Sequence, residues 1–242
     1  MSNTTDVGSS GQNNLYWQED VPAIPVVGDV MDLAFAITCR SLPLDHAWAL
    51  SQAIQGALPW WLNEPQAGLH LIHGGESGNG WYRPEGREDT LYLTRRVRLV
   101  LRLPHHRIAD AQSSLTGRTL EVAGNPLVVG TAVKRPLNYH PALYARHVVT
   151  GPTADEGIFL ANAAQELGAM AVRFKKMLAG KSGVLTTPEG PCTTRSLLVA
   201  ELRPEDALEL QRRGLGPRRT LGCGLFVPHK SIVSTGINGM SR

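Results

Sequence analysis

The sequence predicts an α+β fold made of two tandem ferredoxin-like (RRM-like) βαββαβ domains. Segments with strand and helix patterns follow one another as strand, helix, strand, strand, helix, strand, and this order occurs twice. The 25 glycines and 16 prolines show no repeat period, so they mark turns between these segments. With 242 residues, of which 42% are hydrophobic, the chain is long enough for two small cores without disulfides or metals.

The first domain is expected over residues 31–136, after a mobile N-terminal tail over residues 1–30 that is rich in Ser, Asn, Gly and Pro. Asp45 is the expected N-cap of the first helix, which ends near Gly56. The other expected elements are a strand from Met31 to Cys39, a strand from Gly68 to His73, a long loop from Gly74 to Asp89, a strand from Leu91 to Leu103, a helix from Ile108 to Leu115, and strands within Arg118 to Val133.

The second domain is expected over residues 137–242 and repeats the order of the first. Its last helix has the clearest boundaries, because Pro204 fits the first helical turn and Gly214 the position just past the end. The other expected elements are a strand from Ala142 to Val149, a helix from Asp155 to Gly168, a strand around Ala171 to Phe174, a strand from Thr194 to Leu202, and a strand from Leu225 to Pro228.

Charge is distributed unevenly along the chain. Residues 1–90 hold three basic and eleven acidic side chains, whereas residues 91–242 hold twenty-one basic and ten acidic ones. This asymmetry points to a polyanion-binding face in the later part, although basic side chains that only solvate helix faces would explain the count equally well. The strand from Leu91 to Leu103 favours the first interpretation, because alternation puts Arg96, Arg98 and Arg102 on the face opposite its leucines.

Several classes of protein are excluded. Cys39, Cys192 and Cys223 lie far apart without a Cys-x-x-Cys, which fits a reducing cytosol rather than a zinc knuckle or a secreted disulfide scaffold. No apolar run reaches the ~18 residues of a membrane span, and no signal peptide is evident, so we expect a cytoplasmic protein. No carboxylate cluster suggests magnesium, so we expect neither a metal site nor a cofactor.

A glycine-rich segment, residues 214–224, follows the last helix. Its glycines, Gly214, Gly216, Gly222 and Gly224, do not have the spacing of a dinucleotide-binding motif, and no strand precedes them. The segment also carries Arg218 and Arg219, so its backbone amides and two cations could meet a phosphodiester backbone. A flexible turn is the plainer explanation of the same residues.

Several segments together resemble the CRISPR-associated endoribonucleases of the RAMP superfamily, which cut precursor CRISPR RNA within its repeats. The resemblance covers about residues 31–232. It is carried by Pro43-Leu-Asp-His46, Gly78-Asn-Gly-Trp81, Thr194-Arg-Ser-Leu197 and the glycine-rich segment through His229-Lys230, and is strongest to the subtype first described in myxobacterial CRISPR loci. It implies a C-terminal glycine-rich RAMP loop, CRISPR repeat RNA and its stem-loop as partner, other effector subunits of the Cascade type, and a prokaryotic cytoplasm.

His46 is the candidate catalytic residue. It lies at the expected start of a helix, where the positive backbone amides disfavour imidazolium and keep a neutral base available. A lone histidine more often only packs or caps, but the resemblance places a catalytic histidine at this position. The expected reaction is metal-independent attack of a ribose 2′-hydroxyl on its own 3′ phosphate, giving a 2′,3′-cyclic phosphate. The sequence leaves open whether His46 acts as the base or the acid, and which residue is the second proton carrier.

The expected RNA contacts are Arg95, Arg96, Arg98, Arg102, Arg195, Ser196, Arg218, Arg219, His229 and Lys230. The main alternative function is a non-catalytic RAMP subunit that only binds guide RNA. A third, an unrelated tandem RNA-recognition protein, would need stacking aromatic residues on its central strands, and the strand from Leu91 to Leu103 offers only Tyr92.

Overall fold

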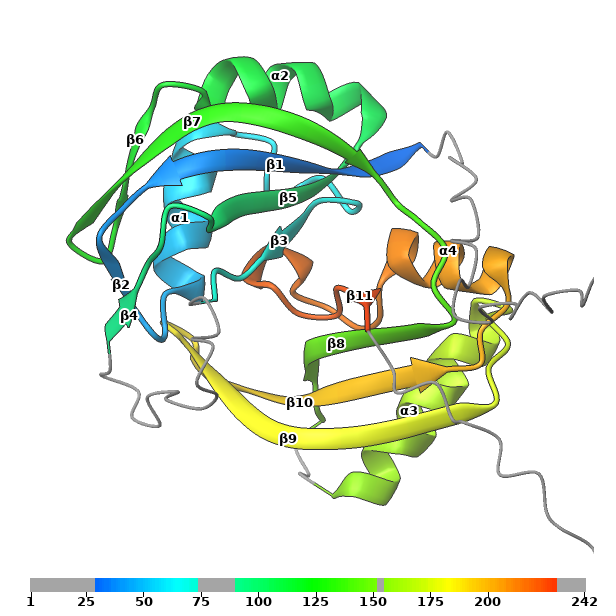
Figure 1. Ribbon diagram of the computed structural model, residues 1–242. Helices are drawn as coiled ribbons and strands as arrows, with labels where there is room; N and C mark the ends of the chain where they lie inside the picture. Colours follow the sequence, from blue (N-terminus) through cyan, green and yellow to red (C-terminus); the bar gives the residue numbers. More distant parts are fainter. Residues whose placement is uncertain (1–28, 74–89, 152–154, 230–242) are drawn as a thin grey trace, which may run out of the picture.

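We analysed a computed structural model that describes residues 29–73, 90–151 and 155–229 (Figure 1). It shows two βαββαβ halves, as the sequence predicts. The N-terminal half consists of β1 (Val30–Thr38), β2 (Ser41–Pro43), α1 (Ala47–Ala57), β3 (Gly68–His70), β4 (Thr90–Tyr92), β5 (Arg98–Pro104), α2 (His105–Leu115), β6 (Thr119–Val122) and β7 (Asn125–Pro136). The C-terminal half consists of β8 (Ala142–Val149), α3 (Glu156–Ala169), β9 (Lys176–Thr187), β10 (Gly190–Ala200), α4 (Pro204–Arg213), the 3₁₀ helix η1 (Arg219–Leu221) and β11 (Val227–Pro228).

Strand order confirms the ferredoxin-like topology in both halves. The first sheet has the order β3-β5-β1-β7-β6 and the second the order β11-β8-β10-β9. The four main strands are β1, β3, β5 and β7 in the first half and β8, β9, β10 and β11 in the second. Numbered 1 to 4 along the chain, they lie in the order 4-1-3-2 in both sheets, and the hairpin strand β6 is added at the β7 edge of the first. Every strand pair is antiparallel.

Each sheet buries one face against its own two helices. In the first half, Leu33, Phe35, Leu99 and Leu101 point to the helices and have no exposed surface. Helix α4 forms as predicted, because Pro204 occupies its first turn, Arg212 and Arg213 lie in its last turn, and Gly214 follows with φ of 70°. The other face of each sheet is not covered by the helices of its own half.

Three predicted elements are wrong in detail. The strand from Leu91 to Leu103 is two strands, because β4 pairs with β2 while β5 joins the main sheet. The strand expected around Ala171 begins only at Lys176, since Ala171 has φ of 59° and forms a turn. The N-cap of α1 is His46, not Asp45, whose Oδ2 instead accepts a hydrogen bond from the Thr186 amide at 3.0 Å.

The expected N-terminal tail over residues 1–30, apart from its last two residues, and the expected loop from Gly74 to Asp89 lie outside the described residues. The predicted domain boundaries therefore remain predictions. The two halves nevertheless touch directly: α1 contacts β9 and η1, and η1 contacts β3. A small buried cluster of Ala47, Leu185, Cys192 and Cys223 fills this junction.

Candidate active site and nucleic-acid interface

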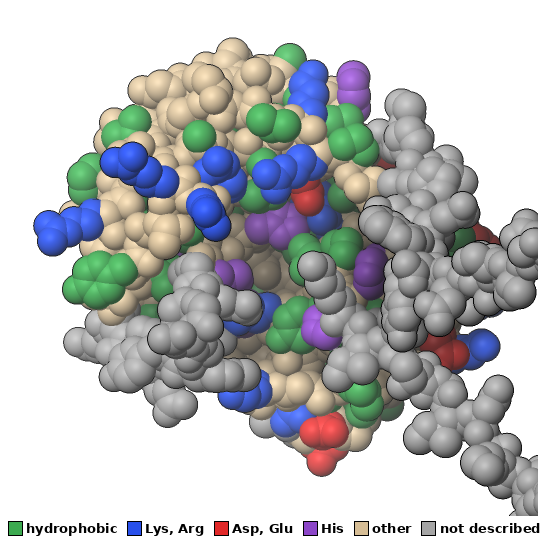
Figure 2. All heavy atoms as spheres, in the orientation of Figure 1, with side chains coloured by type: hydrophobic (Ala, Val, Ile, Leu, Met, Phe, Trp, Pro, Cys, Tyr) green, Lys and Arg blue, Asp and Glu red, His purple; other side chains and the backbone are tan. Residues whose placement is uncertain are grey.

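A groove lies between the two halves, bounded in each half by the sheet face that is not covered by that half's own helices (Figure 1 and Figure 2). Figure 2 shows the surface hollowed there, with histidine, lysine and arginine side chains gathered around the hollow. Asp32, Arg102 and Arg135 are register partners and therefore share the open face of the first sheet. On the second sheet, Thr194 lies on the face opposite Arg195, which pairs with Glu156 of α3.

His46 is the N-cap residue of α1, and it is 2% exposed. Its Nδ1 is 2.9 Å from the Pro43 carbonyl oxygen, and its Nε2 is 3.2 Å from the amide nitrogen of Ile72, the second residue after β3. The Ile72 amide can only donate and the Pro43 carbonyl can only accept, so the ring is neutral with its proton on Nδ1. Both ring nitrogens are therefore occupied by backbone groups in this structure.

The pKa of His46 is lowered, mainly because burial removes water from the charged form; hydrogen bonds to the carbonyls of Pro43 and Leu44 and the charge of Asp45 act in the opposite direction. The expected neutral state is thus present, but burial rather than the helix N-terminus is its main cause. The catalytic role remains a prediction.

Arg102 is not part of an exposed arginine row. It is 1% exposed, and it donates from Nε and Nη2 to the two carboxylate oxygens of Asp32 at 2.8 and 3.0 Å. Its Nη1 donates to the carbonyls of Gln211 and Phe226, both at 2.9 Å. The prediction of surface exposure is wrong, because this guanidinium is used to join the two halves.

The other predicted arginines of this region remain accessible. Arg95 and Arg96 are exposed and precede β5 rather than lying within it. Arg98 is partly exposed, and its Nη1 donates to the carbonyls of Arg95 and Val97 at 2.8 and 2.9 Å. Because Arg98 is four residues from Arg102 on one strand, it lies on the open face of the sheet.

Residues 214–224 form a compact turn that packs against β3. The glycines Gly214, Gly216, Gly222 and Gly224 all have φ between 67° and 89°. A Cβ on Gly222 would lie 2.5 Å from Cγ of Leu71, and one on Gly224 would lie 2.0 Å from the carbonyl oxygen of Leu215. Close packing, as well as positive φ, therefore explains glycine at these two positions.

The two arginines of this turn are differently placed. Arg218 is partly exposed, with Nη2 2.9 Å from Oε2 of the exposed Glu189. The guanidinium of Arg219 donates to the carbonyls of Gln66, Arg212 and Arg213, and burial, followed by the charge of Arg102, lowers its pKa to about 10. Arg219 thus binds the end of α4, whereas Arg218 can exchange its surface partner for another anion.

The remaining predicted contacts are scattered. Arg195 is 14% exposed and lies 2.5 Å from Glu156 on the helix-covered face, and Ser196 is buried at a register shift of β10. His229 is exposed, with its ring 5.6 Å from that of Tyr144. Lys230 lies outside the described residues.

One feature of the groove was not predicted. His70 of β3 lies with Nε2 3.3 Å from Oδ1 of Asp32, and their side chains are 17% and 18% exposed. His70 and Asp32 are 38 positions apart in the sequence, so no local pattern of residues predicts this pair. Only the order β3-β5-β1 brings this histidine and this carboxylate together.

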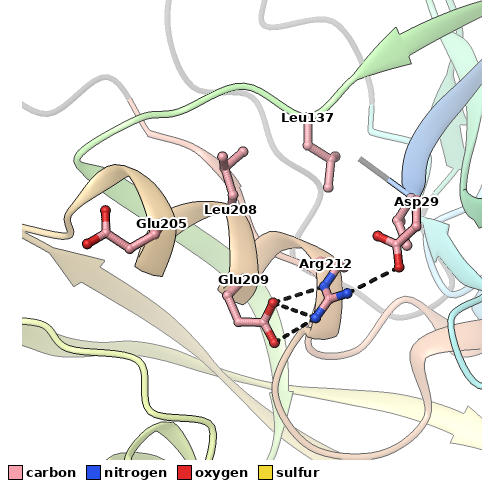
Figure 3. Close-up of a pocket in the computed structure, with 7 residues that line it drawn as sticks. Asp29, Leu137, Glu205, Leu208, Glu209 and Arg212 are labelled. Carbon is pink, nitrogen blue, oxygen red and sulfur yellow. Dashed lines mark hydrogen bonds and ion pairs between the residues drawn. The ribbon is translucent and has the colours of Figure 1, made fainter. Parts of the chain in front are cut away.

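Two surface pockets lie away from these residues. One, of about 330 Å³, is lined by Pro65, Gln66, Arg212 and Arg213. The other, of about 230 Å³, has Leu137 and Leu208 beside the carboxylates of Glu205, Glu209 and Asp29 (Figure 3). Arg212 lies between Asp29 and Glu209, at 3.1 and 2.7 Å, so its charge is already compensated there. Neither pocket is lined by a predicted site residue.

Within the described ranges, no group of three or more His, Cys, Asp or Glu side chains could hold a metal ion. None of the helices in the described part of the chain is both long and apolar enough to cross a membrane.

Comparison with known proteins gives consistent matches along the chain. A protein of Myxococcus xanthus (strain DK1622), the CRISPR-associated endonuclease Cas6, is 30% identical over 198 residues, which are 82% of this chain and 81% of that protein. A solved structure of a CRISPR-associated protein Cas6 aligns with a TM-score of 0.59 at 10% identity, covering 83% of this chain and all of that one. A Cas6-related protein from Pyrococcus furiosus aligns with a TM-score of 0.57 at 12% identity, covering 83% and 99% of the two chains.

The two structural matches support the shared fold, and the family model for Cas6 CRISPR proteins matches residues 31–231. The chain therefore belongs to the Cas6 family of CRISPR proteins.

Proposed function

We propose that this protein is an endoribonuclease that binds CRISPR repeat RNA and cuts precursor CRISPR RNA into guide RNA. The observation that carries the proposal is the family match over residues 31–231, which spans both halves and the groove between them. Cations at the groove support the proposal. Arg98 and Arg135 supply cations for phosphates on one open face, and exposed Lys181 of β9 adds a cation from the second half.

The proposed reaction is metal-independent. The 2′-hydroxyl loses its proton to a base, its oxygen forms a bond to the adjacent phosphorus, and the bond from phosphorus to the 5′ oxygen breaks as that oxygen gains a proton. The products are a 2′,3′-cyclic phosphate and a 5′-hydroxyl. His46 is the proposed base, because its ring is held neutral. It can accept the proton at Nε2 once the hydrogen bond from the Ile72 amide is exchanged for one from the substrate.

The burial of His46 favours one alternative, a non-catalytic subunit that only binds guide RNA. In that case the contacts to Pro43 and Ile72 would be the whole role of the ring. We further propose that the cleaved RNA stays bound and carries the protein into an effector complex, where other subunits would join it.

A single experiment separates these functions. Purified protein is incubated with repeat RNA in EDTA, with a matched RNA that carries a 2′-deoxy nucleotide before the mapped cut as control. We expect one defined cut in the first RNA, with a cyclic phosphate end, and none in the second. RNA that is bound but left intact would support the binding subunit, and a requirement for added magnesium would contradict the proposed chemistry.

A further inference from the structure

His70 and Asp32 form a histidine–carboxylate pair in the groove that the sequence did not reveal. The pair is made by two different strands, β3 and β1, on either side of β5. Asp32 holds Nε2 of the ring at 3.3 Å, which leaves Nδ1 as the nitrogen that can meet a reacting group. A carboxylate in this position fixes the orientation of an imidazole and stabilises the imidazolium when it forms.

The fold does not need His70 to compensate the charge of Asp32. Arg102 already donates to both carboxylate oxygens, at 2.8 and 3.0 Å. The pKa of Asp32 lies well below its usual range even though burial raises it, because the charges of Arg102 and His70 and their hydrogen bonds outweigh the burial. The imidazole is therefore an additional donor, and it keeps access to the groove with 17% of its side chain exposed.

The surroundings of His70 suit a phosphate. Its register partner on β5 is Val100. Arg98 lies two residues from Val100 on the same sheet face, so the Cα atoms of Val100 and Arg98 are about 7 Å apart by strand geometry. The other charged groups near the pair are Arg102, Arg219, through its charge interaction with Asp32, and Arg135, the register partner of Asp32 on β7. A phosphodiester beside His70 would thus have a cation on the same sheet face.

His70 also lies close to the proposed base. His46 Nε2 is 3.2 Å from the amide of Ile72, and Ile72 follows His70 by two residues, a span of at most about 7 Å. Since His46 is hydrogen-bonded to the segment that directly follows His70, a base and an acid at these two positions can act on the two sides of one phosphodiester. His46 is buried and neutral, whereas His70 is paired with a carboxylate and partly exposed, and these are the different environments that an acid and a base require.

We propose that His70 is the general acid of the reaction, donating a proton from Nδ1 to the leaving 5′ oxygen while Asp32 holds its Nε2. The inference rests on the proposed function, because it assigns the second proton carrier of that same cleavage. The proton that His70 loses is balanced by the one that His46 gains from the 2′-hydroxyl, so the step consumes no other reactant.

The test uses His70→Gln, since the glutamine amide can still donate to Asp32 but cannot transfer a proton. Single-turnover cleavage is measured on repeat RNA and on the same RNA with sulfur in place of the leaving 5′ oxygen at the mapped cut. A thiolate leaves without a proton, so it does not need the acid. The matched control is His105→Gln, because His105 is exposed at the start of α2, on the helix-covered side of the sheet.

We expect His70→Gln to lose roughly 10²-fold or more in rate on ordinary RNA and to cut the sulfur-substituted RNA at close to the wild-type rate, with the control unaffected on both. A wild-type rate on ordinary RNA would overturn the proposal. So would an equal defect on both substrates, which would make His70 a structural residue. If the unaltered protein cuts neither RNA, the proposed function itself fails, and this result is distinct from a failure of His70 alone.

Discussion

Arg102 of β5 donates two parallel hydrogen bonds to Asp32 of β1, while its third nitrogen binds the carbonyls of Gln211 and Phe226 in the other half. One buried guanidinium thus links the central strands of the first sheet to the end of α4 and to the segment before β11. The two parallel hydrogen bonds from Nε and Nη2 of Arg102 to one carboxylate need a planar guanidinium, so lysine could not replace arginine here.

Arg102→Ala should destabilise the fold by about 3–5 kcal/mol, because it leaves Asp32 and two carbonyls without their buried partner. The free energy of unfolding in urea is the measurement. Arg135→Ala is the matched control: Arg135 is the exposed register partner of Asp32 on β7, so its loss should cost at most about 0.5 kcal/mol. Equal effects of the two variants would show that the Arg102 contacts do not join the halves.

His46→Ala should lose roughly 10²-fold or more in single-turnover cleavage while its affinity for repeat RNA changes by only a few fold. Alanine also leaves the Pro43 carbonyl and the Ile72 amide unpaired, so His46→Gln is the better test. Glutamine can donate to the first and accept from the second, but it cannot transfer a proton. If His46→Gln cuts at the wild-type rate, the ring of His46 is only structural.

Stability should depend on pH through His46. Its pKa is lowered in the folded protein, so below the unfolded value of about 6.5 the unfolded chain binds the proton more readily, and the free energy of unfolding falls as the pH falls. Above that value the contribution is constant. His46→Gln should flatten this part of the curve between about pH 7 and pH 5, measured by urea unfolding. Parallel curves for the two proteins would contradict the buried, neutral ring.

The two neighbouring arginines of the 214–224 turn should behave differently. Arg218 can exchange its ion pair with Glu189 for one with a phosphate, and Arg218→Gln removes this cation. The variant should therefore reduce the slope of log affinity for RNA against log salt by about one. Arg219→Gln should mainly lower the free energy of unfolding, because its contacts are backbone carbonyls of Gln66, Arg212 and Arg213. An unchanged slope for Arg218→Gln would show that this turn does not reach the RNA backbone.

Local sequence patterns predicted much of the fold. Pro204 and Gly214 predicted the ends of α4, and alternation around Leu99 and Leu101 predicted the buried face of β5. Helix α3 begins next to Asp155 as predicted, where Oδ1 of Asp155 accepts a hydrogen bond from the Ile158 amide at 2.8 Å. These signals depend on residues a few positions apart, so they can be read along the chain. The motif Pro43-Leu-Asp-His46, together with the other short motifs, also indicated the Cas6-type family from the sequence.

Tertiary structure alone decided which polar residues meet. Alternation placed Arg98 and Arg102 on one face, but only the tertiary contacts with Gln211 of α4 and with Phe226 bury Arg102, whereas Arg98 stays partly exposed. The pairing of Asp32 with His70 and the contact of His46 with Ile72 join residues 38 and 26 positions apart. Contacts of this kind follow from strand order and from the docking of one half on the other, which no local pattern of residues specifies.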